Sequence, residues 1–191
     1  NDRVMRARLA DAKFFYETDL ATPLADRRAK LEGVLFHKRL GSVGDKVKRI
    51  ERLVPLLGAE LGLAKAIVET ALAGAALAKC DLVTLMVGEL PELQGEMGMA
   101  YALAQGAKPE VARVVAEHYQ PRGADDPTAP SDAAALVALA DRLDTLVGCF
   151  AIGQVPTGTA DPLALRRAAL GVLRTVLDER ATPALRALRP R

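Results

Sequence analysis

The strongest constraint on the fold is the apolar spacing within SVGDKVKRIERLVPLLG, residues 42–58. Five apolar residues follow one another there at steps of four or three: Val43, Val47, Ile50, Val54 and Leu57. Side chains at this spacing share one face of an α-helix, and that face must be buried against other elements. Ser42 and Asp45 stand at the positions of a capping box, so we expect the helix to begin just after Ser42.

The composition favours the same structure for the whole chain. Half of the 191 residues are hydrophobic, but only 4% are aromatic and there is no Trp, so Leu, Ala and Val must build the core. Ala and Leu are good helix formers, whereas strands favour β-branched and aromatic residues. We find no repeat and no convincing strand, and we therefore predict an all-α, multi-helix bundle.

Caps, prolines and glycines divide this bundle into helices. The expected helical segments are residues 4–18, 22–40, 42–58, 63–90, 91–107, 109–119, 132–150 and a last helix that begins at Asp161 and Pro162. The segment 63–90 is long and mostly apolar, as in a central buried helix, and we expect a break near Gly74 or Lys79. QPRGADDPTAPSD is the clearest loop.

A glycine-, proline- and threonine-rich stretch, GQVPTGTADPLALRRAA, resembles a phosphate-binding loop at first sight. A Walker-type loop needs a preceding strand and a Lys followed by Ser or Thr, and no lysine follows Lys108. We conclude that it is not a nucleotide-binding loop. Asp161 is expected to cap the helix that follows, with Arg166 and Arg167 one turn further along.

Four residues suggest a metal site: His37, Cys80, Asp81 and Asp141. Imidazoles and carboxylates from separate helices can converge on a divalent cation and activate water. Their order resembles the His, His–Asp, Asp pattern of the HD phosphohydrolase superfamily, with Cys80 in place of the second histidine and Lys79 beside it. We interpret the motif as degenerate and expect no metal.

Each of these residues also has a structural interpretation. His37 would be a helix-end or hydrogen-bonded core residue, and a buried Cys80 would act as a small hydrophobic residue. Asp141 would pair with Lys79 or Arg142. The second histidine, His118, is expected at the surface or as a helix cap. An HD-type metal-dependent phosphohydrolase remains the alternative function.

Two features bear on the compartment. Cys80 and Cys149 lack the paired spacing of a zinc site or a disulfide framework, which favours a reducing, cytoplasmic location. No apolar run reaches membrane-spanning length and no signal peptide is visible, so we expect no membrane partner.

Five blocks of sequence together resemble the beta subunit of bacterial glycyl-tRNA synthetase, from about Lys13 to Arg174. The blocks are FFYETDLATPLADRRAKLEGVLFHKRLGSVGDKVKRI, AKCDLVTLMVGELPELQGEMGMAYA, EHYQPR, ALADRLDTLVGCFAIGQVPTG and DPLALRRAALGVLR. The resemblance implies a two-subunit enzyme in which the alpha subunit carries the class II site that uses ATP and Mg. The beta subunit supplies tRNA-binding modules.

The resemblance also implies a place for this chain. Residues 1–178 would be the HD-like helical domain, and residues 179–191 would begin the following segment of a longer chain. The domain would be non-catalytic, with no cofactor of its own. Its partners would be the alpha subunit, tRNA(Gly) and the remainder of the beta chain.

Contact with tRNA would use basic side chains on the N-terminal part and near the last helix. The candidates are Lys38, Arg39, Lys46, Lys48, Arg49, Arg52, Arg166 and Arg167, with Arg122 as a further secondary choice. Those of the 42–58 helix lie off its apolar stripe and are expected to face outward. A solvated helix face, with the domain acting as a structural spacer, is the alternative.

Overall fold

The computed structural model describes residues 2–123, 125–157, 161 and 163–177, and this part of the chain is mostly helical. Its α-helices are α1 (Asp2–Leu20), α2 (Val43–Glu60), α3 (Lys65–Leu77), α4 (Leu85–Glu89), α5 (Glu96–Ala104), α6 (Pro109–Glu117), α7 (Asp132–Ala151) and α8 (Leu165–Leu177). Three 3-10 helices are η1 (Leu24–Gly33), η2 (Cys80–Val83) and η3 (Pro91–Leu93), and two short strands are β1 (Leu35–His37) and β2 (Gly41–Ser42). The predicted helical bundle is confirmed. The predicted boundary at residue 178 and the segment 179–191 lie outside the described residues.

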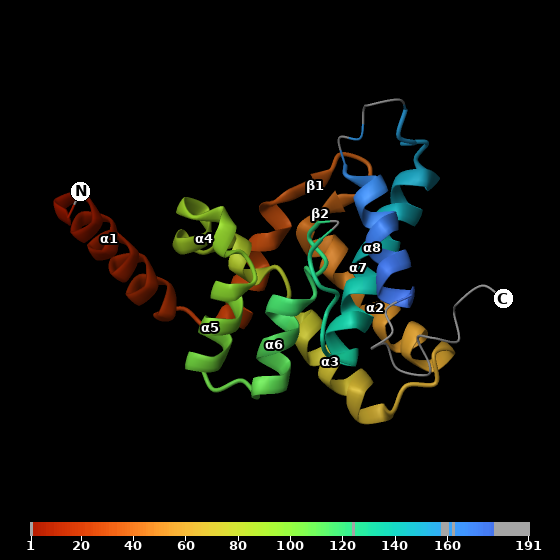
Figure 1. Cartoon of the computed structure of the whole chain (residues 1–191), viewed down its shortest axis with the longest axis horizontal. Coiled ribbons are helices and arrows are strands. Elements are labelled where there is room, and N and C mark those ends of the chain that lie inside the picture. Colours follow the sequence, from red (N-terminus) through yellow and green to blue (C-terminus); the bar gives the residue numbers. More distant parts are fainter. Residues whose placement is uncertain (1, 124, 158–160, 162, 178–191) are drawn as a thin grey trace.

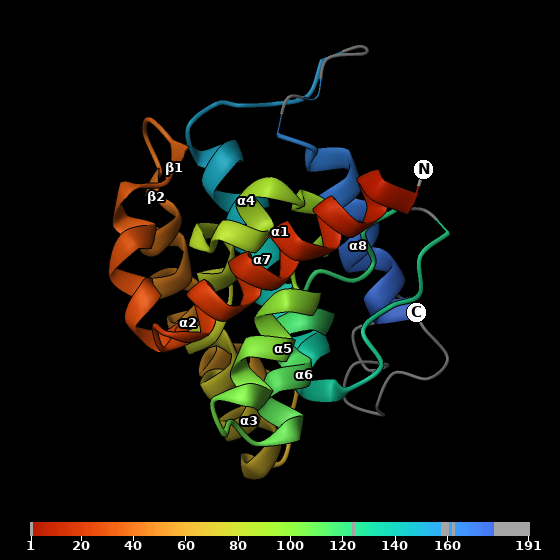
Figure 2. The same ribbon diagram turned by 90° about the vertical axis from the view of Figure 1, so that its left-hand side faces the viewer.

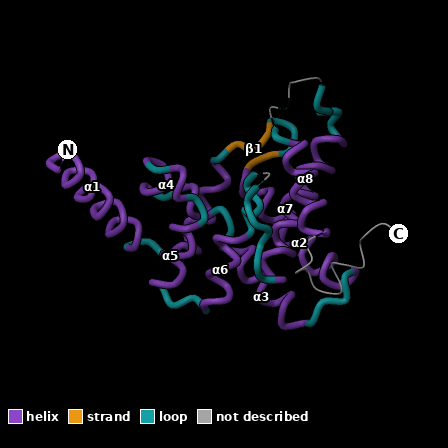
Figure 3. Tube along the Cα trace, viewed as in Figure 1, coloured by secondary structure: helices purple, strands orange, loops and turns teal. Residues whose placement is uncertain are grey.

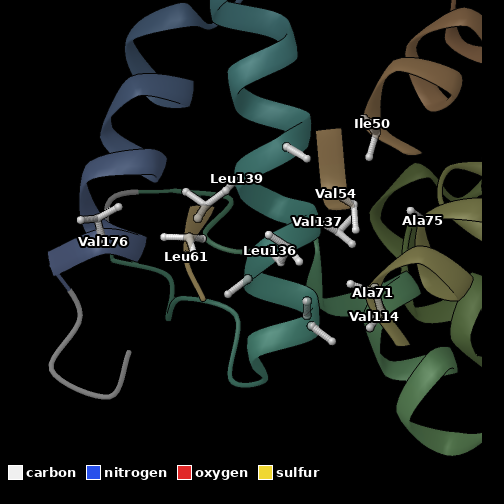
Figure 4. Packing of buried hydrophobic residues seen from close by; sticks show 14 residues of the cluster. Ile50, Val54, Leu61, Ala71, Ala75, Val114, Leu136, Val137, Leu139 and Val176 are labelled. Atoms are coloured by element: carbon white, nitrogen blue, oxygen red, sulfur yellow. The ribbon is translucent and has the colours of Figure 1, made fainter. Parts of the chain in front are cut away.

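Helix α7 is the centre of the bundle, and α2, α3, α6 and α8 all pack against it (Figure 1). Residues 133–140 are buried on every turn, and five of them are alanines, which lets neighbouring helices approach closely. Figure 4 shows Val137 of α7 beside Val54 of α2, with Leu139 on the side of Val176. The core therefore surrounds the N-terminal half of α7, which ends next to Asp141.

Helix α1 extends away from this bundle and contacts α4 and α5 (Figure 1; in the turned view of Figure 2 it lies in front of them). Its C-terminal end is anchored by the buried carboxylate of Asp19, which accepts hydrogen bonds from the backbone N–H groups of Leu85 (3.0 Å) and Met86 (2.9 Å). Asp19 also pairs with Arg27 (3.2 Å) and accepts a hydrogen bond from the hydroxyl of Tyr101 (3.0 Å). Within the described residues, none of the helices combines the length and apolar character needed to cross a bilayer.

The expected helix over residues 22–40 is wrong beyond Gly33. The chain forms η1 and then an antiparallel hairpin of β1 and β2 (orange in Figure 3). Val34, Leu35 and Phe36 are β-branched or large side chains that suit an extended backbone. Gly41 has a φ of 86°, which few residues except glycine adopt readily, and this reverses the chain into α2.

Two predicted helix boundaries are confirmed. The Ser42 hydroxyl accepts a hydrogen bond from the Asp45 N–H (3.0 Å), and the Asp45 carboxylate accepts one from the Ser42 N–H (3.0 Å). The long apolar segment breaks next to Lys79, whose φ is 65°. This left-handed residue ends the run of α3 and starts η2.

Gly74 of α3 lies against α6 so closely that a Cβ there would collide with the side chain of Val114. We expect Gly74→Ala to lower the free energy of unfolding by about 1–3 kcal/mol, because overpacking forces both helices to shift. Gly88 of α4 is the matched control, since a Cβ there meets nothing within 4 Å. Urea denaturation should show Gly88→Ala neutral or slightly stabilising; equal losses in both variants would contradict the close α3–α6 contact.

Candidate functional site

Asp141 of α7 lies at the centre of a buried charge network. One carboxylate oxygen is 2.8 Å from Nζ of Lys79, and the other is 2.9 Å from Nζ of Lys46. Burial alone would raise the pKa of Asp141, but the two ammonium groups outweigh it and hold this pKa far below its usual range. Asp141 is therefore ionised and already neutralised by side chains of the protein. The predicted pairing with Lys79 is confirmed.

The sequence predicts that Lys46 faces outward, and this prediction is wrong. Lys46 is 4% exposed. Besides Asp141, its ammonium group donates to the carboxylate of Asp144 (3.0 Å) and the hydroxyl of Thr145 (2.6 Å). It also lies 4.7 Å from the centre of the Phe36 ring. Lys46 thus joins α2 to α7 and is not available to a nucleic acid.

His118 is fully buried, so its predicted surface position is wrong, but the alternative of a capping position is confirmed, since His118 is the C-cap residue of α6. Its Nδ1 lies 3.1 Å from the carbonyl oxygen of Val114 and 2.9 Å from that of Val115, and it must therefore donate a proton. Its Nε2 lies 3.5 Å from Nζ of Lys79 and offers a lone pair to that ammonium group. Burial and the charge of Lys79 lower the pKa of His118 to about 3, so the imidazole is neutral at physiological pH.

The four positions of the HD-type motif do not converge on one site. Cys80 is buried in the second core cluster, and burial raises the pKa of its thiol to about 12. Asp81 accepts a hydrogen bond from the N–H of Gly95, and burial raises the pKa of its carboxyl group. His37 lies partly exposed in the hairpin and accepts a hydrogen bond from the N–H of Arg39 (3.2 Å).

Among the described residues, no three His, Cys, Asp or Glu side chains are grouped so that they could hold a metal ion. The donors also have unsuitable chemistry, since a metal needs a thiolate and an unpaired carboxylate. Cys80 is held as a thiol, and Asp141 is occupied by two lysines. The residues present therefore do not fit a divalent cation, and the absence of a cofactor stays a prediction.

A pocket of about 600 Å³ lies beside this network, between the hairpin, η3, the segment 118–122 that follows α6, α7 and α8. Five basic side chains line it: Lys46, Lys79, Arg122, Arg142 and Arg167. Glu92 and Asp141 are the carboxylates in its described wall. We call it the cationic pocket. Of its basic residues, Lys46, Arg122 and Arg167 are among the predicted tRNA contacts, but no local signal in the sequence indicates that these distant segments form a pocket.

The remaining predicted tRNA-binding residues fall into two groups. Arg49 is partly buried, where it pairs with Asp144 and donates to the carbonyl oxygen of Leu40 (2.9 Å), and Lys48 forms an ion pair with Glu32 (2.6 Å). Lys48 is nevertheless exposed, as are the others: Lys38, Arg39, Arg52, Arg166 and Arg167. Arg39 of the hairpin donates to the carbonyl oxygen of Ile152 (2.9 Å), which ties the hairpin to the end of α7.

The predicted cap at the start of the last helix is confirmed. One carboxylate oxygen of Asp161 accepts from the N–H of Leu165 (2.7 Å), and the other accepts from the N–H of Arg166 (2.9 Å). These are the groups that would otherwise attract an external anion. Part of the preceding stretch, residues 158–160 and 162, lies outside the described residues.

Comparison with known proteins gives a consistent result. Residues 1–190 match the family described as "Glycyl-tRNA synthetase beta subunit". The chain is 54% identical over 177 residues to the glycine–tRNA ligase beta subunit of Myxococcus xanthus, with 92% of this chain and 25% of that protein covered. It is 51% identical to the beta subunit of Phenylobacterium zucineum, over 94% of this chain and 27% of that protein.

The match to the beta subunit of Desulforamulus reducens extends over 98% of this chain at 49% identity, and over 27% of that protein. The chain thus spans about a quarter of the length of these relatives. Because the family match covers nearly every residue, the chain belongs to the glycyl-tRNA synthetase beta subunit family.

Proposed function

We propose that the chain is a non-catalytic helical module, with an HD-like origin, of the beta subunit of a two-subunit glycine–tRNA ligase. It contributes to tRNA binding, to subunit assembly or to both during ATP-dependent formation of glycyl-tRNA. Its partners are the alpha subunit, tRNA(Gly) and the rest of the beta chain, and the chemistry takes place at the alpha subunit. The relatives, which are named as glycine–tRNA ligase beta subunits, support this assignment.

The state of Asp141 supports the non-catalytic part of the proposal. A carboxylate that holds a metal or moves a proton must be able to exchange its partner. Asp141 is fixed between two ammonium groups at 2.8 and 2.9 Å, and its pKa is far below the range of a general base at neutral pH. The network therefore acts as a structural link between α2, α7 and the start of η2.

One surface supports the tRNA-binding part. Arg39, Arg49 and Arg52 lie around one groove between α2 and α7, and Lys38 is exposed at the tip of the adjoining hairpin. Of these, Lys38, Arg39 and Arg52 form no ion pair within the described part of the chain. We call these three the hairpin surface. Unpaired, solvent-exposed cations are the side chains that bind phosphates and release counterions.

The test is a tRNA-binding measurement on the assembled ligase. Replacing Lys38, Arg39 and Arg52 together by glutamine should weaken binding and lower the slope of log affinity against log salt by up to about three units, because each phosphate contact contributes about one. Fluorescence anisotropy at several salt concentrations gives both quantities.

The matched control replaces three exposed basic residues by glutamine: Lys65 of α3, Lys108 at the N-cap of α6 and Arg113 of α6. This triple variant carries the same change of net charge and should keep the wild-type slope. If both triple variants behave like wild type while glycylation is unchanged, tRNA does not contact the hairpin surface. Subunit assembly, measured by sedimentation of the alpha and beta chains, then becomes the role to test.

A further inference from the structure

The cationic pocket contains more positive charge than the protein neutralises. Lys46 and Lys79 share the carboxylate of Asp141. Asp144, the second carboxylate near Lys46, is itself shared with Arg49. Each of these carboxylates thus serves two cations, so the buried network leaves an excess of positive charge next to the pocket. The further carboxylate of the described wall, Glu92, cannot by itself balance this excess together with the three arginines of the pocket.

Arg142 adds to this excess. Its guanidinium group donates to three backbone carbonyl oxygens, those of Ala138 (3.0 Å), Tyr119 (3.1 Å) and Pro121 (3.0 Å). Within the described residues it forms no ion pair with a carboxylate. Burial partly desolvates the guanidinium group and lowers the pKa of Arg142. The carbonyl groups orient this cation but do not neutralise it.

Two further guanidinium groups stand at the exposed edge of the pocket. Arg122 donates to the carbonyl oxygen of Gln94 (2.8 Å), and its guanidinium carbon lies 5.9 Å from the centre of the Tyr119 ring. Arg167 of α8 is exposed and has no ion pair in the described part of the chain. Arg167 also lines a second pocket of about 460 Å³, which adjoins the first at Pro121 and Ala164.

We infer that the cationic pocket binds a phosphate monoester group, which Arg122 and Arg167 contact while Lys46, Lys79 and Arg142 supply the surrounding positive field. A dianion matches the charge excess better than a single carboxylate, which would leave the inner cations uncompensated. Guanidinium groups offer paired N–H donors that suit phosphate oxygens. A volume of about 600 Å³ has room for a group the size of a mononucleotide.

This inference goes beyond the proposed function and does not depend on it. The hairpin surface and the cationic pocket have no residue in common, so each can be inactivated separately. The phosphate could come from a free mononucleotide or from the 5′ end of an RNA. Both sources present the same dianionic group.

Isothermal titration calorimetry with the 191-residue chain at low salt tests the inference. Inorganic phosphate and AMP should bind, and adenosine should not. The double variant with Arg122→Gln and Arg167→Gln should bind AMP at least about tenfold more weakly, because charge-assisted hydrogen bonds to phosphate are lost. Both side chains are exposed, so this variant should stay folded, which circular dichroism can verify.

The matched control is Arg113→Gln on α6, which removes one exposed guanidinium group outside the pocket and should keep wild-type affinity. The source of the phosphate is identified by titrating the protein with a 5′-phosphorylated oligoribonucleotide and with its dephosphorylated form. Tighter binding of the phosphorylated RNA than of AMP assigns the site to an RNA end, and the reverse assigns it to a free nucleotide.

Two results would overturn the inference. One is the absence of measurable heat with both phosphate and AMP at millimolar concentration and low salt. The other is binding of AMP that is equally strong in wild type and in the Arg122/Arg167 double variant. A thermal-shift experiment gives a second readout, since phosphate should raise the melting temperature of the wild type but not of the double variant.

Discussion

Asp141→Asn should lower the free energy of unfolding by about 3–5 kcal/mol, because removal of one partner leaves buried charges uncompensated. The asparagine keeps the size of the side chain, so the loss reports on charge and not on packing. Lys79 then loses its ion pair and keeps the neutral His118 at 3.5 Å and the Tyr119 ring at 4.5 Å, while Lys46 keeps Asp144 as a carboxylate partner. Urea denaturation followed by circular dichroism measures the change.

Two further variants make this result specific. Asp11→Asn on the exposed side of α1 removes one carboxylate without touching the network and should stay within about 0.5 kcal/mol of wild type. Combining Asp141→Asn with Lys79→Met should cost less than the sum of the single losses, since the uncompensated ammonium group disappears. Additive losses would mean that the two side chains do not interact.

The second large effect is a dependence of stability on pH that comes from His118. The folded imidazole has a pKa of about 3, against 6.5 for an ordinary histidine. Between these values the unfolded chain binds one more proton than the folded chain, so stability rises with pH and falls as acid is added. The expected slope is about 1.4 kcal/mol per pH unit below pH 6.

The charged groups around His118 all belong to the same network. Lys79 opposes its protonation, because Nε2–H would then face an ammonium group at 3.5 Å. Asp141 favours protonation, but it is already paired with the two lysines. The lowered pKa of Asp141 also makes the free energy of unfolding decrease when acid is added. This happens only below about pH 4, where the carboxylate of the unfolded chain becomes protonated.

His118→Gln should flatten the curve of unfolding free energy against pH between 6.5 and 4.5, whatever its effect on stability at pH 7. Val115→Ala is the control for lost packing, since it removes buried methyl groups from the same helix without removing a titrating group. It should shift the whole curve downward and keep its slope. A His118→Gln variant with the wild-type slope would show that His118 titrates normally in the fold.

Local sequence rules predicted the parts of the fold that local chemistry determines. The apolar stripe of α2, the capping box at Ser42 and the cap at Asp161 depend on residues within one or two turns of each other. The break at Lys79 also lies where the pattern suggested. In each case the partner residues are close in the sequence, so spacing alone was sufficient.

The buried polar residues could not be predicted in this way. Periodicity assigned Lys46 to solvent because lysine is polar, but its partners on α7 are 95 and 98 residues away. The same applies to His118, whose buried position depends on Lys79 from another segment. The composition gave no indication of a strand. It missed the hairpin because two very short strands need only a few β-favouring residues beside Gly41.

The left-handed backbone conformation of Lys79 affects how the domain responds to loss of the Lys79–Asp141 contact. A non-glycine residue at φ 65° costs about 1–2 kcal/mol, and the contact of its ammonium group with Asp141 offsets that cost. The backbone of the turn between α3 and η2 is thus strained, and its conformation depends on the contact with Asp141 of α7. If that anchor is lost, the turn can relax, and because Lys79 itself lines the cationic pocket, the pocket wall changes together with the neighbouring Cys80 and Asp81.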